Sequence, residues 1–163
     1  MVEPETGAGL RDLPITAQVP AVLLTALVCG PRAGLLASVA YLTLGLVLLP
    51  VFQDGGGFDY LLQPSFGFLA GFIPAAWFCG RLARQPGMNT LERLFGTAVL
   101  GLLLIHLSGV LNLLLGALVH RWGESLPQLV LTYSLLALPG QLLMCAVVAL
   151  LARVLRPLLL IER

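Results

Sequence analysis

The sequence predicts an all-α membrane protein, a bundle of about five transmembrane helices with a glycine-rich extracellular loop. Of the 163 residues, 58% are hydrophobic and only 10% are charged, which leaves too few polar groups for a water-facing surface. The apolar residues fall into five runs separated by charges or turn residues. A bilayer can cover the outside of such a bundle, provided that helices satisfy the backbone polar groups.

The first two runs predict two helices followed by a loop. The first run covers residues 15–29 and ends at Gly30 and Pro31, a pair that terminates helices. The second covers residues 33–49 and is closed by Pro50. The following segment contains three consecutive glycines, at positions 55–57, which oppose helix formation and allow backbone to pass close to a ligand.

The three later runs predict longer spans. They begin near Pro64, Leu94 and Leu126 and end near Arg81, Val119 and Leu155. The last two are long enough to cross a hydrocarbon core about 30 Å thick with some tilt. Pro139 and Gly140 interrupt the fifth run, so the backbone there must face protein or a cavity. We expect one domain over residues 1–163, with a polar N-terminal tail over residues 1–13.

The arginines predict the orientation. If five spans alternate in direction, only Arg11 and Arg121 lie at one end, and the positive-inside rule makes the other end cytoplasmic. The C-terminus is then cytoplasmic and the glycine loop extracellular, in a protein of the plasma membrane. Because this orientation requires export of the N-terminal tail, we expect an additional span before Met1. The arginines at the cytoplasmic end are Arg32, Arg81, Arg84, Arg93, Arg153, Arg156 and Arg163.

Polar residues inside the spans are candidate sites, because placing them in lipid is costly. Gln141 directly follows the break in the fifth run, where its carboxamide and a freed backbone carbonyl can both face a ligand in the same space. The alternative is a proline kink in which the Gln141 side chain satisfies the freed backbone groups. Asn112 shares a helix face with Ser108 and Gly109, which predicts a close helix contact. Asn112 therefore either bonds a neighbouring helix or contacts a ligand. His106 is interpreted as a structural or ligand-contacting imidazole.

Several chemistries are excluded by the sequence. The spans contain no acidic residue, no serine lies in a G-x-S-x-G setting, and a Walker A motif is absent, so we expect neither an enzyme nor ATP use by this subunit. The net charge of +1, without a basic cluster, argues against nucleic acid. The cysteines Cys29, Cys79 and Cys145 lack metal-ligand spacing, so no metal and no cofactor are expected.

A series of short motifs follows in one order along nearly the whole chain. They are the segments 14–18, 30–34, 41–45, 50–52, 55–57, 64–72 and 138–142, which read PITAQ, GPRAG, YLTLG, PVF, GGG, PSFGFLAGF and LPGQL. In this combination the chain resembles the BioY family, the biotin-specific substrate-binding (S) components of energy-coupling factor transporters. The resemblance implies a six-helix plan, of which this chain would hold helices two to six.

The resemblance also implies a function. Such an S component captures biotin, or a related small vitamin, from outside and docks on a transmembrane coupling subunit driven by two cytoplasmic ATPase subunits. The loop at residues 53–63 would close over the vitamin. The family's last helix carries Pro-Gly-Asp-x-x-Lys, whose Asp and Lys contact biotin; here these positions hold Gln141 and Met144. Gln141 can hydrogen-bond a ureido group, whereas Met144 cannot anchor a carboxylate.

The residues expected to contact the ligand lie on several spans and on the loop. The alternatives to a biotin S component are an S component for a different vitamin and a non-transporting membrane scaffold or assembly protein, with a membrane enzyme a more distant third. The expected substrate-binding residues are Gln141, Asn112, Tyr41, Gln18, Gly56, Phe58 and Phe68.

Overall fold

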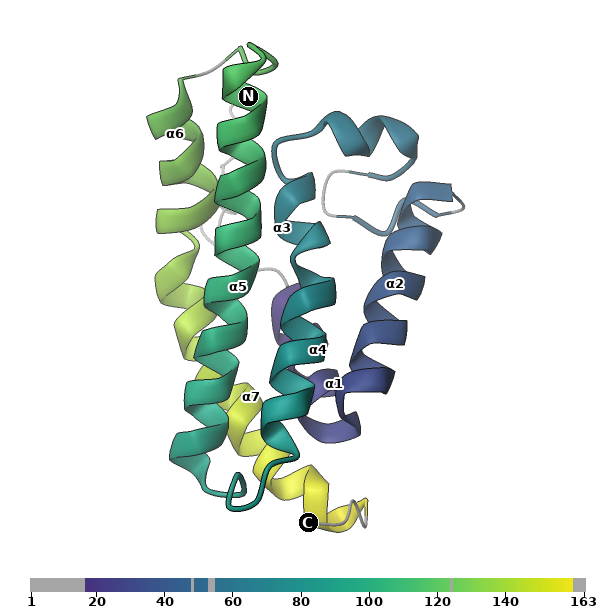
Figure 1. Ribbon diagram of the computed structural model, residues 1–163, viewed down its shortest axis with the longest axis vertical. Coiled ribbons are helices and arrows are strands. Elements are labelled where there is room, and N and C mark those ends of the chain that lie inside the picture. The colour runs from purple at the N-terminus through teal and green to yellow at the C-terminus, as the bar shows by residue number, and fades with distance from the viewer. Residues whose placement is uncertain (1–16, 48, 53–54, 124, 160–163) are drawn as a thin grey trace, which may run out of the picture.

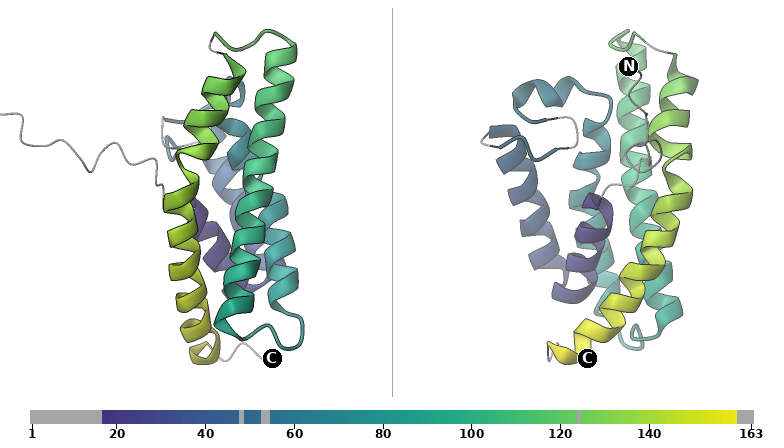
Figure 2. Two further views of the ribbon diagram at one scale, coloured as in Figure 1. Left: turned by 90° about the vertical axis from the view of Figure 1, so that its left-hand side faces the viewer. Right: turned by 180° about the vertical axis from the view of Figure 1, so that it is seen from behind.

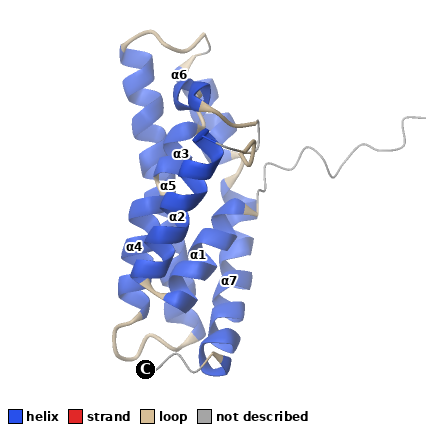
Figure 3. Ribbon diagram, turned by 90° about the vertical axis from the view of Figure 1, so that its right-hand side faces the viewer, coloured by secondary structure: helices blue, strands red, loops and turns tan. Residues whose placement is uncertain are grey.

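The computed structural model describes residues 17–47, 49–52, 55–123 and 125–159, and within these residues the protein is a bundle of helices (Figures 1 and 3). This architecture confirms the predicted all-α fold. The elements in chain order are α1 (Gln18–Cys29), α2 (Pro31–Val47), the 3-10 helix η1 (Phe58–Leu62), α3 (Phe66–Ala70), α4 (Phe72–Ala83), α5 (Leu91–Leu118), α6 (Leu126–Val130), the π-helix η2 (Leu131–Leu135) and α7 (Leu138–Leu158).

Within the residues that the structure describes, three helical segments are long and apolar enough to cross a membrane. They are Phe66–Ala83, Leu91–Leu118 and Leu126–Leu158, which correspond to the third, fourth and fifth predicted spans. The helices α1 and α2 are apolar but shorter. With 12 residues, α1 is about 18 Å long and occupies only the lower half of the bundle in Figure 1. Its first turn therefore lies at mid-depth, inside the protein.

Small residues bring α1, α2 and α4 close together. Gly30 has a φ of +88° and ends α1, and Pro31 begins α2, as the sequence predicts. A Cβ at Gly34 of α2 would lie 3.0 Å from the backbone of Ala26 and 3.3 Å from the Cβ of Ala76 on α4. Because lipid removes the hydrophobic force between helices, such close packing is what holds them together.

The outward faces of the two longest helices are apolar. On α5 and α7 the exposed leucines and valines recur every three or four residues, which places them on one face of each helix. This pattern is that of a lipid-facing stripe. These side chains are Leu103, Leu107, Leu111, Leu114 and Leu118 on α5, and Leu143, Val147, Leu150, Val154 and Leu158 on α7.

Two elements differ from their predicted form. The segment after the glycines contains a short 3-10 helix, η1, within the predicted loop. The irregular part of the fifth span lies at residues 131–137, ahead of Pro139, which sits in the first turn of α7. The reason is that a proline at the start of a helix needs no N–H partner, while its ring disturbs the preceding turn.

Candidate ligand-binding cavity

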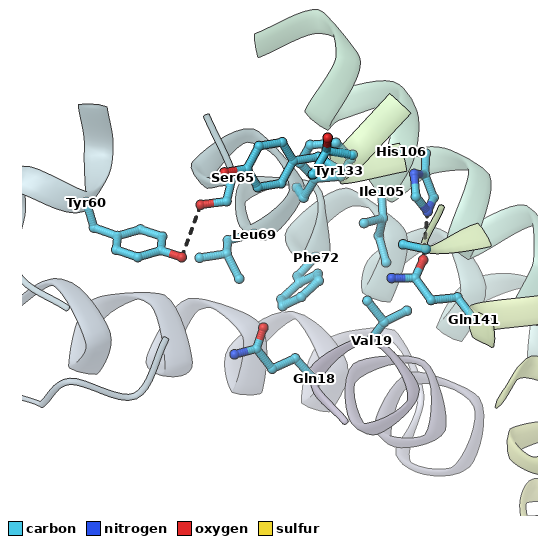
Figure 4. Close-up of a pocket in the computed structure, with 13 residues that line it drawn as sticks. Gln18, Val19, Tyr60, Ser65, Leu69, Phe72, Ile105, His106, Tyr133 and Gln141 are labelled. Carbon is cyan, nitrogen blue, oxygen red and sulfur yellow. Dashed lines mark hydrogen bonds between the residues drawn. The ribbon is translucent and has the colours of Figure 1, made fainter. Parts of the chain in front are cut away.

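A cavity of about 270 Å³ lies between the first turn of α1, α3, the middle of α5 and η2 (Figure 4). Seven elements contribute to its wall, among them the loop element η1, so the loop and the bundle meet around one space. The lining residues are Gln18, Val19, Tyr60, Ser65, Phe68, Leu69, Phe72, Ile105, His106, Thr132, Tyr133, Ala137 and Gln141.

A buried polar network forms one side of the cavity. His106 on α5 is 6% exposed, and its Nε2 lies 2.7 Å from Oε1 of Gln141 on α7. Its Nδ1 lies 2.8 Å from Oγ of Ser134 on η2. Because an amide oxygen only accepts, Nε2 of His106 donates to Gln141, and in the neutral imidazole Nδ1 accepts the hydroxyl proton of Ser134. Both nitrogens of the ring therefore have a partner.

This network leaves one donor group for a ligand. With Oε1 of Gln141 bound to His106, the amide nitrogen of Gln141 points toward the space between the lining side chains (Figure 4). An amide nitrogen carries two hydrogens and can bind a carbonyl oxygen. His106 thus fixes the orientation of a hydrogen-bond donor at the cavity wall.

The π-helix η2 shapes the adjacent wall. Its wider turn places Thr132 and Tyr133 at the cavity and Ser134 against His106. The ring of Phe68 from α3 lies edge-on to His106, at 5.6 Å between centroids, and 6.3 Å from the ring of Tyr133 at a tilt of 31°. π-Helical turns occur frequently at functional sites. Here the turn aligns aromatic and hydroxyl groups along one side of the cavity.

The loop supplies the opposite side through Tyr60. The hydroxyl of Ser65 donates to the hydroxyl oxygen of Tyr60 over 3.1 Å, and both residues line the cavity. The Tyr60 ring is buried and packs against Phe52, with 4.6 Å between centroids. Gln18 and Phe72 lie on the remaining side (Figure 4). The loop that follows the glycines is therefore part of the cavity wall.

Three of the residues predicted from the sequence line this cavity: Gln141, Gln18 and Phe68. Asn112 lies elsewhere, in the contact between α3 and α5. Its Nδ2 donates to the carbonyl of Pro64 over 3.2 Å, and a Cβ at Gly67 would overlap its side chain. Asn112 therefore makes the interhelical hydrogen bond that was one of its two predicted roles.

The other three predicted residues lie outside the cavity. Tyr41 lines a separate cavity of about 180 Å³ between α1 and α2, and its hydroxyl donates to the carbonyl of Val51. Gly56 packs against the end of α2, where a Cβ would come within 2.7 Å of the carbonyls of Gly45 and Leu49. Phe58 is 66% exposed.

The sequence prediction omitted several cavity residues. Tyr60 and Ser65 sit in or beside the predicted loop and carried no signal of their own. The polar residues inside the apolar runs did carry a signal, because intramembrane polar groups are costly. The cavity residues omitted from the predicted set include His106, Thr132, Tyr133, Tyr60 and Ser65.

Comparison with known proteins relates the chain to one family. The family model described as the BioY family matches residues 7–160. The biotin transporter BioY of Rhizobium etli is 30% identical over 158 residues, which cover 92% of this chain and 81% of that protein. The biotin transporter BioY of Thermotoga maritima is 38% identical over 102 residues, which cover 62% of this chain and 59% of that protein.

Other relatives are matched over a smaller part of their length. A probable biotin transporter BioY of Lysinibacillus sphaericus is 37% identical over 94 residues, and the match spans about half, 48%, of that protein. Among solved structures, the S-component for biotin from an ECF-type ABC transporter has the same fold, with a TM-score of 0.73 and 23% identity over 91% of this chain and 78% of that one. On the match over residues 7–160, the chain belongs to the BioY family.

Proposed function

We propose that this multi-pass membrane protein is the substrate-capturing subunit of a biotin importer of the energy-coupling factor type. The observation that carries the proposal is the cavity between the loop and the bundle, in which His106 holds the amide of Gln141 toward the enclosed space. The names of the relatives identify biotin as the first ligand to test. The volume of about 270 Å³ is close to the lower limit of small-molecule pockets, roughly 300 Å³, so the cavity can hold only a small ligand.

The chemistry of the wall supports a neutral polar ring system as the ligand. The amide nitrogen of Gln141 can donate to a ureido carbonyl, and Phe68, Phe72 and Tyr133 offer apolar faces to a bicyclic ring. Among the described residues, the lining contains no Lys or Arg. The carboxylate of biotin would therefore be held by a neutral hydroxyl donor such as that of Thr132. We propose binding without chemical conversion of the ligand.

The energy for transport would come from partner subunits. We propose that a transmembrane coupling subunit and two cytoplasmic ATPase subunits assemble with this chain at the bilayer. The described arginines support a cytoplasmic C-terminus, because six of them lie at the lower end of the bundle and Arg121 lies at the upper end, above α5 (Figures 1 and 2). The cavity then opens on the extracellular half of the bundle.

Calorimetry on the purified chain tests this proposal. Biotin added at micromolar concentration in the absence of ATP should bind, and biotin methyl ester should bind with only moderately lower affinity, because the described lining offers the carboxylate a hydroxyl donor but no Lys or Arg. Thiamine and riboflavin serve as controls that should not bind. Absence of biotin binding would overturn the ligand assignment, and binding of another vitamin instead would retain the S-component function with a different substrate.

A further inference from the structure

A second group of polar residues lies at the opposite end of the molecule from the ligand cavity. Arg156, in the last turn of α7, is 7% exposed. Its Nη1 donates to the carbonyl of Met88 over 3.0 Å, and its Nη2 donates to the carbonyl of Ala83. The side chain therefore joins α7 to the end of α4 and to the connection between α4 and α5.

Arg84, at the end of α4, also donates a hydrogen bond to a main-chain carbonyl. Its Nη2 donates to the carbonyl of Cys29 over 3.0 Å, at the end of α1. A Cβ at Gly30 would overlap the guanidinium group, so glycine at this turn makes room for Arg84. Within the described residues, the hydrogen bonds of Arg84 and Arg156 go to main-chain carbonyls, which orient a guanidinium group but do not neutralise it.

The two arginines line one cavity of about 490 Å³. Its other lining residues in the described part of the chain supply amides and small side chains but no carboxylate: Ala83, Gln85, Pro86, Gly87 and Asn89. Guanidinium groups bind phosphate oxygens in a planar, forked geometry, and amide side chains add further donors. The cavity therefore has the chemistry of a phosphate site.

The position of the cavity indicates the source of the phosphate. It lies at the arginine-rich end, between the last turn of α7 and the connection between α4 and α5, which lie at the same end of the bundle (Figure 2). One turn above, the guanidinium of Arg81 lies 5.1 Å from the ring of Trp77, an arrangement typical of the headgroup region. Basic pockets between transmembrane helices on the cytoplasmic side bind anionic lipid headgroups.

We propose that the cavity lined by Arg84 and Arg156 binds the phosphate of an anionic phospholipid, in the leaflet at the arginine-rich end. The bound headgroup neutralises the two guanidinium groups and joins α1, the connection between α4 and α5, and α7. This site is separate from the ligand cavity, and it does not depend on what that cavity holds.

Native mass spectrometry of the full chain in detergent tests the proposal, with phosphatidylglycerol and phosphatidylcholine as the added lipids. Phosphatidylglycerol should be retained preferentially, and Arg84→Gln should weaken its binding about tenfold, since it removes a charge-assisted hydrogen bond to the bound phosphate. Arg153→Gln is the matched control: it removes the same charge from an exposed position on α7 that does not line the cavity. Arg153→Gln should leave binding within about a factor of two, because no direct contact with the phosphate is lost.

Two further measurements keep the result interpretable. Arg84→Lys retains the charge and should retain most of the binding, which separates charge loss from a folding defect. Inorganic phosphate alone should not raise the thermal unfolding midpoint as phosphatidylglycerol does; an equal rise would keep the anion site and overturn its lipid ligand. Equal losses in Arg84→Gln and Arg153→Gln, or equal retention of phosphatidylcholine, would overturn the site.

Discussion

His106 connects polar groups from three separate elements, and its replacement tests how much that connection contributes. In His106→Leu, the hydroxyl of Ser134 and the amide oxygen of Gln141 lose their hydrogen bonds to the imidazole while both residues stay buried. An unsatisfied buried polar group costs about 1 to 3 kcal/mol, so the free energy of unfolding should fall by about 2 kcal/mol or more. Unfolding in detergent, followed by circular dichroism, measures this change. An unchanged stability would contradict the network.

Replacement of Ser134 tests which nitrogen of the His106 imidazole carries the proton. Ser134→Ala removes the donor to Nδ1 but leaves the bond from Nε2 to Gln141 in place. Ligand affinity should fall by less than about tenfold, in keeping with the roughly 1 kcal/mol of one neutral hydrogen bond. In ¹⁵N spectra of the wild type, Nε2 should carry the proton and Nδ1 should not. The opposite tautomer would mean that Gln141 presents its nitrogen to His106.

At the scale of elements, the contact between α3 and α5 controls the position of Phe68. A Cβ at Gly109 on α5 would overlap the ring of Phe68, which lines the ligand cavity. Gly109→Ala should therefore destabilise the protein by about 1 to 3 kcal/mol through overpacking and weaken ligand binding. Gly96→Ala on the same helix is the control, because a Cβ there meets open space. That variant should be neutral or slightly stabilising. Equal effects of the two variants in thermal unfolding and calorimetry would contradict this packing.

The sequence predicted the elements better than their contacts. Gly30 and Pro31, Pro50 and the glycine triplet mark ends of elements by their backbone chemistry, which acts locally. The pairing of His106 with Gln141 joins residues 35 positions apart and depends on how α5 and α7 are rotated about their axes. A lone histidine in an apolar run gives no indication of that rotation. For the same reason, the sequence places Asn112 in a close helix contact but does not identify its hydrogen-bond partner, the carbonyl of Pro64.

For the whole molecule, the property to test is its orientation in the bilayer. If the arginine-rich end is cytoplasmic, a cysteine in place of Thr90, in the connection between α4 and α5, should react with an impermeant maleimide only after the cells are permeabilised. A cysteine in place of Ser125, between α5 and α6, should react in intact cells. The background is the chain with Cys29→Ser, since Cys79 and Cys145 are buried. The reverse labelling pattern would contradict the orientation.

The central claim is that the cavity beside His106 is the biotin site, and the affinity of a matched pair of glutamine variants tests it most directly. Gln141→Leu removes the amide that faces the cavity, whereas Gln128→Leu makes the same chemical change at an exposed position on α6. Calorimetry should show that Gln141→Leu weakens biotin binding about tenfold or more. Gln128→Leu should bind as the wild type does. Unchanged affinity in Gln141→Leu, in protein that still folds and binds biotin, would place the site elsewhere and contradict the claim.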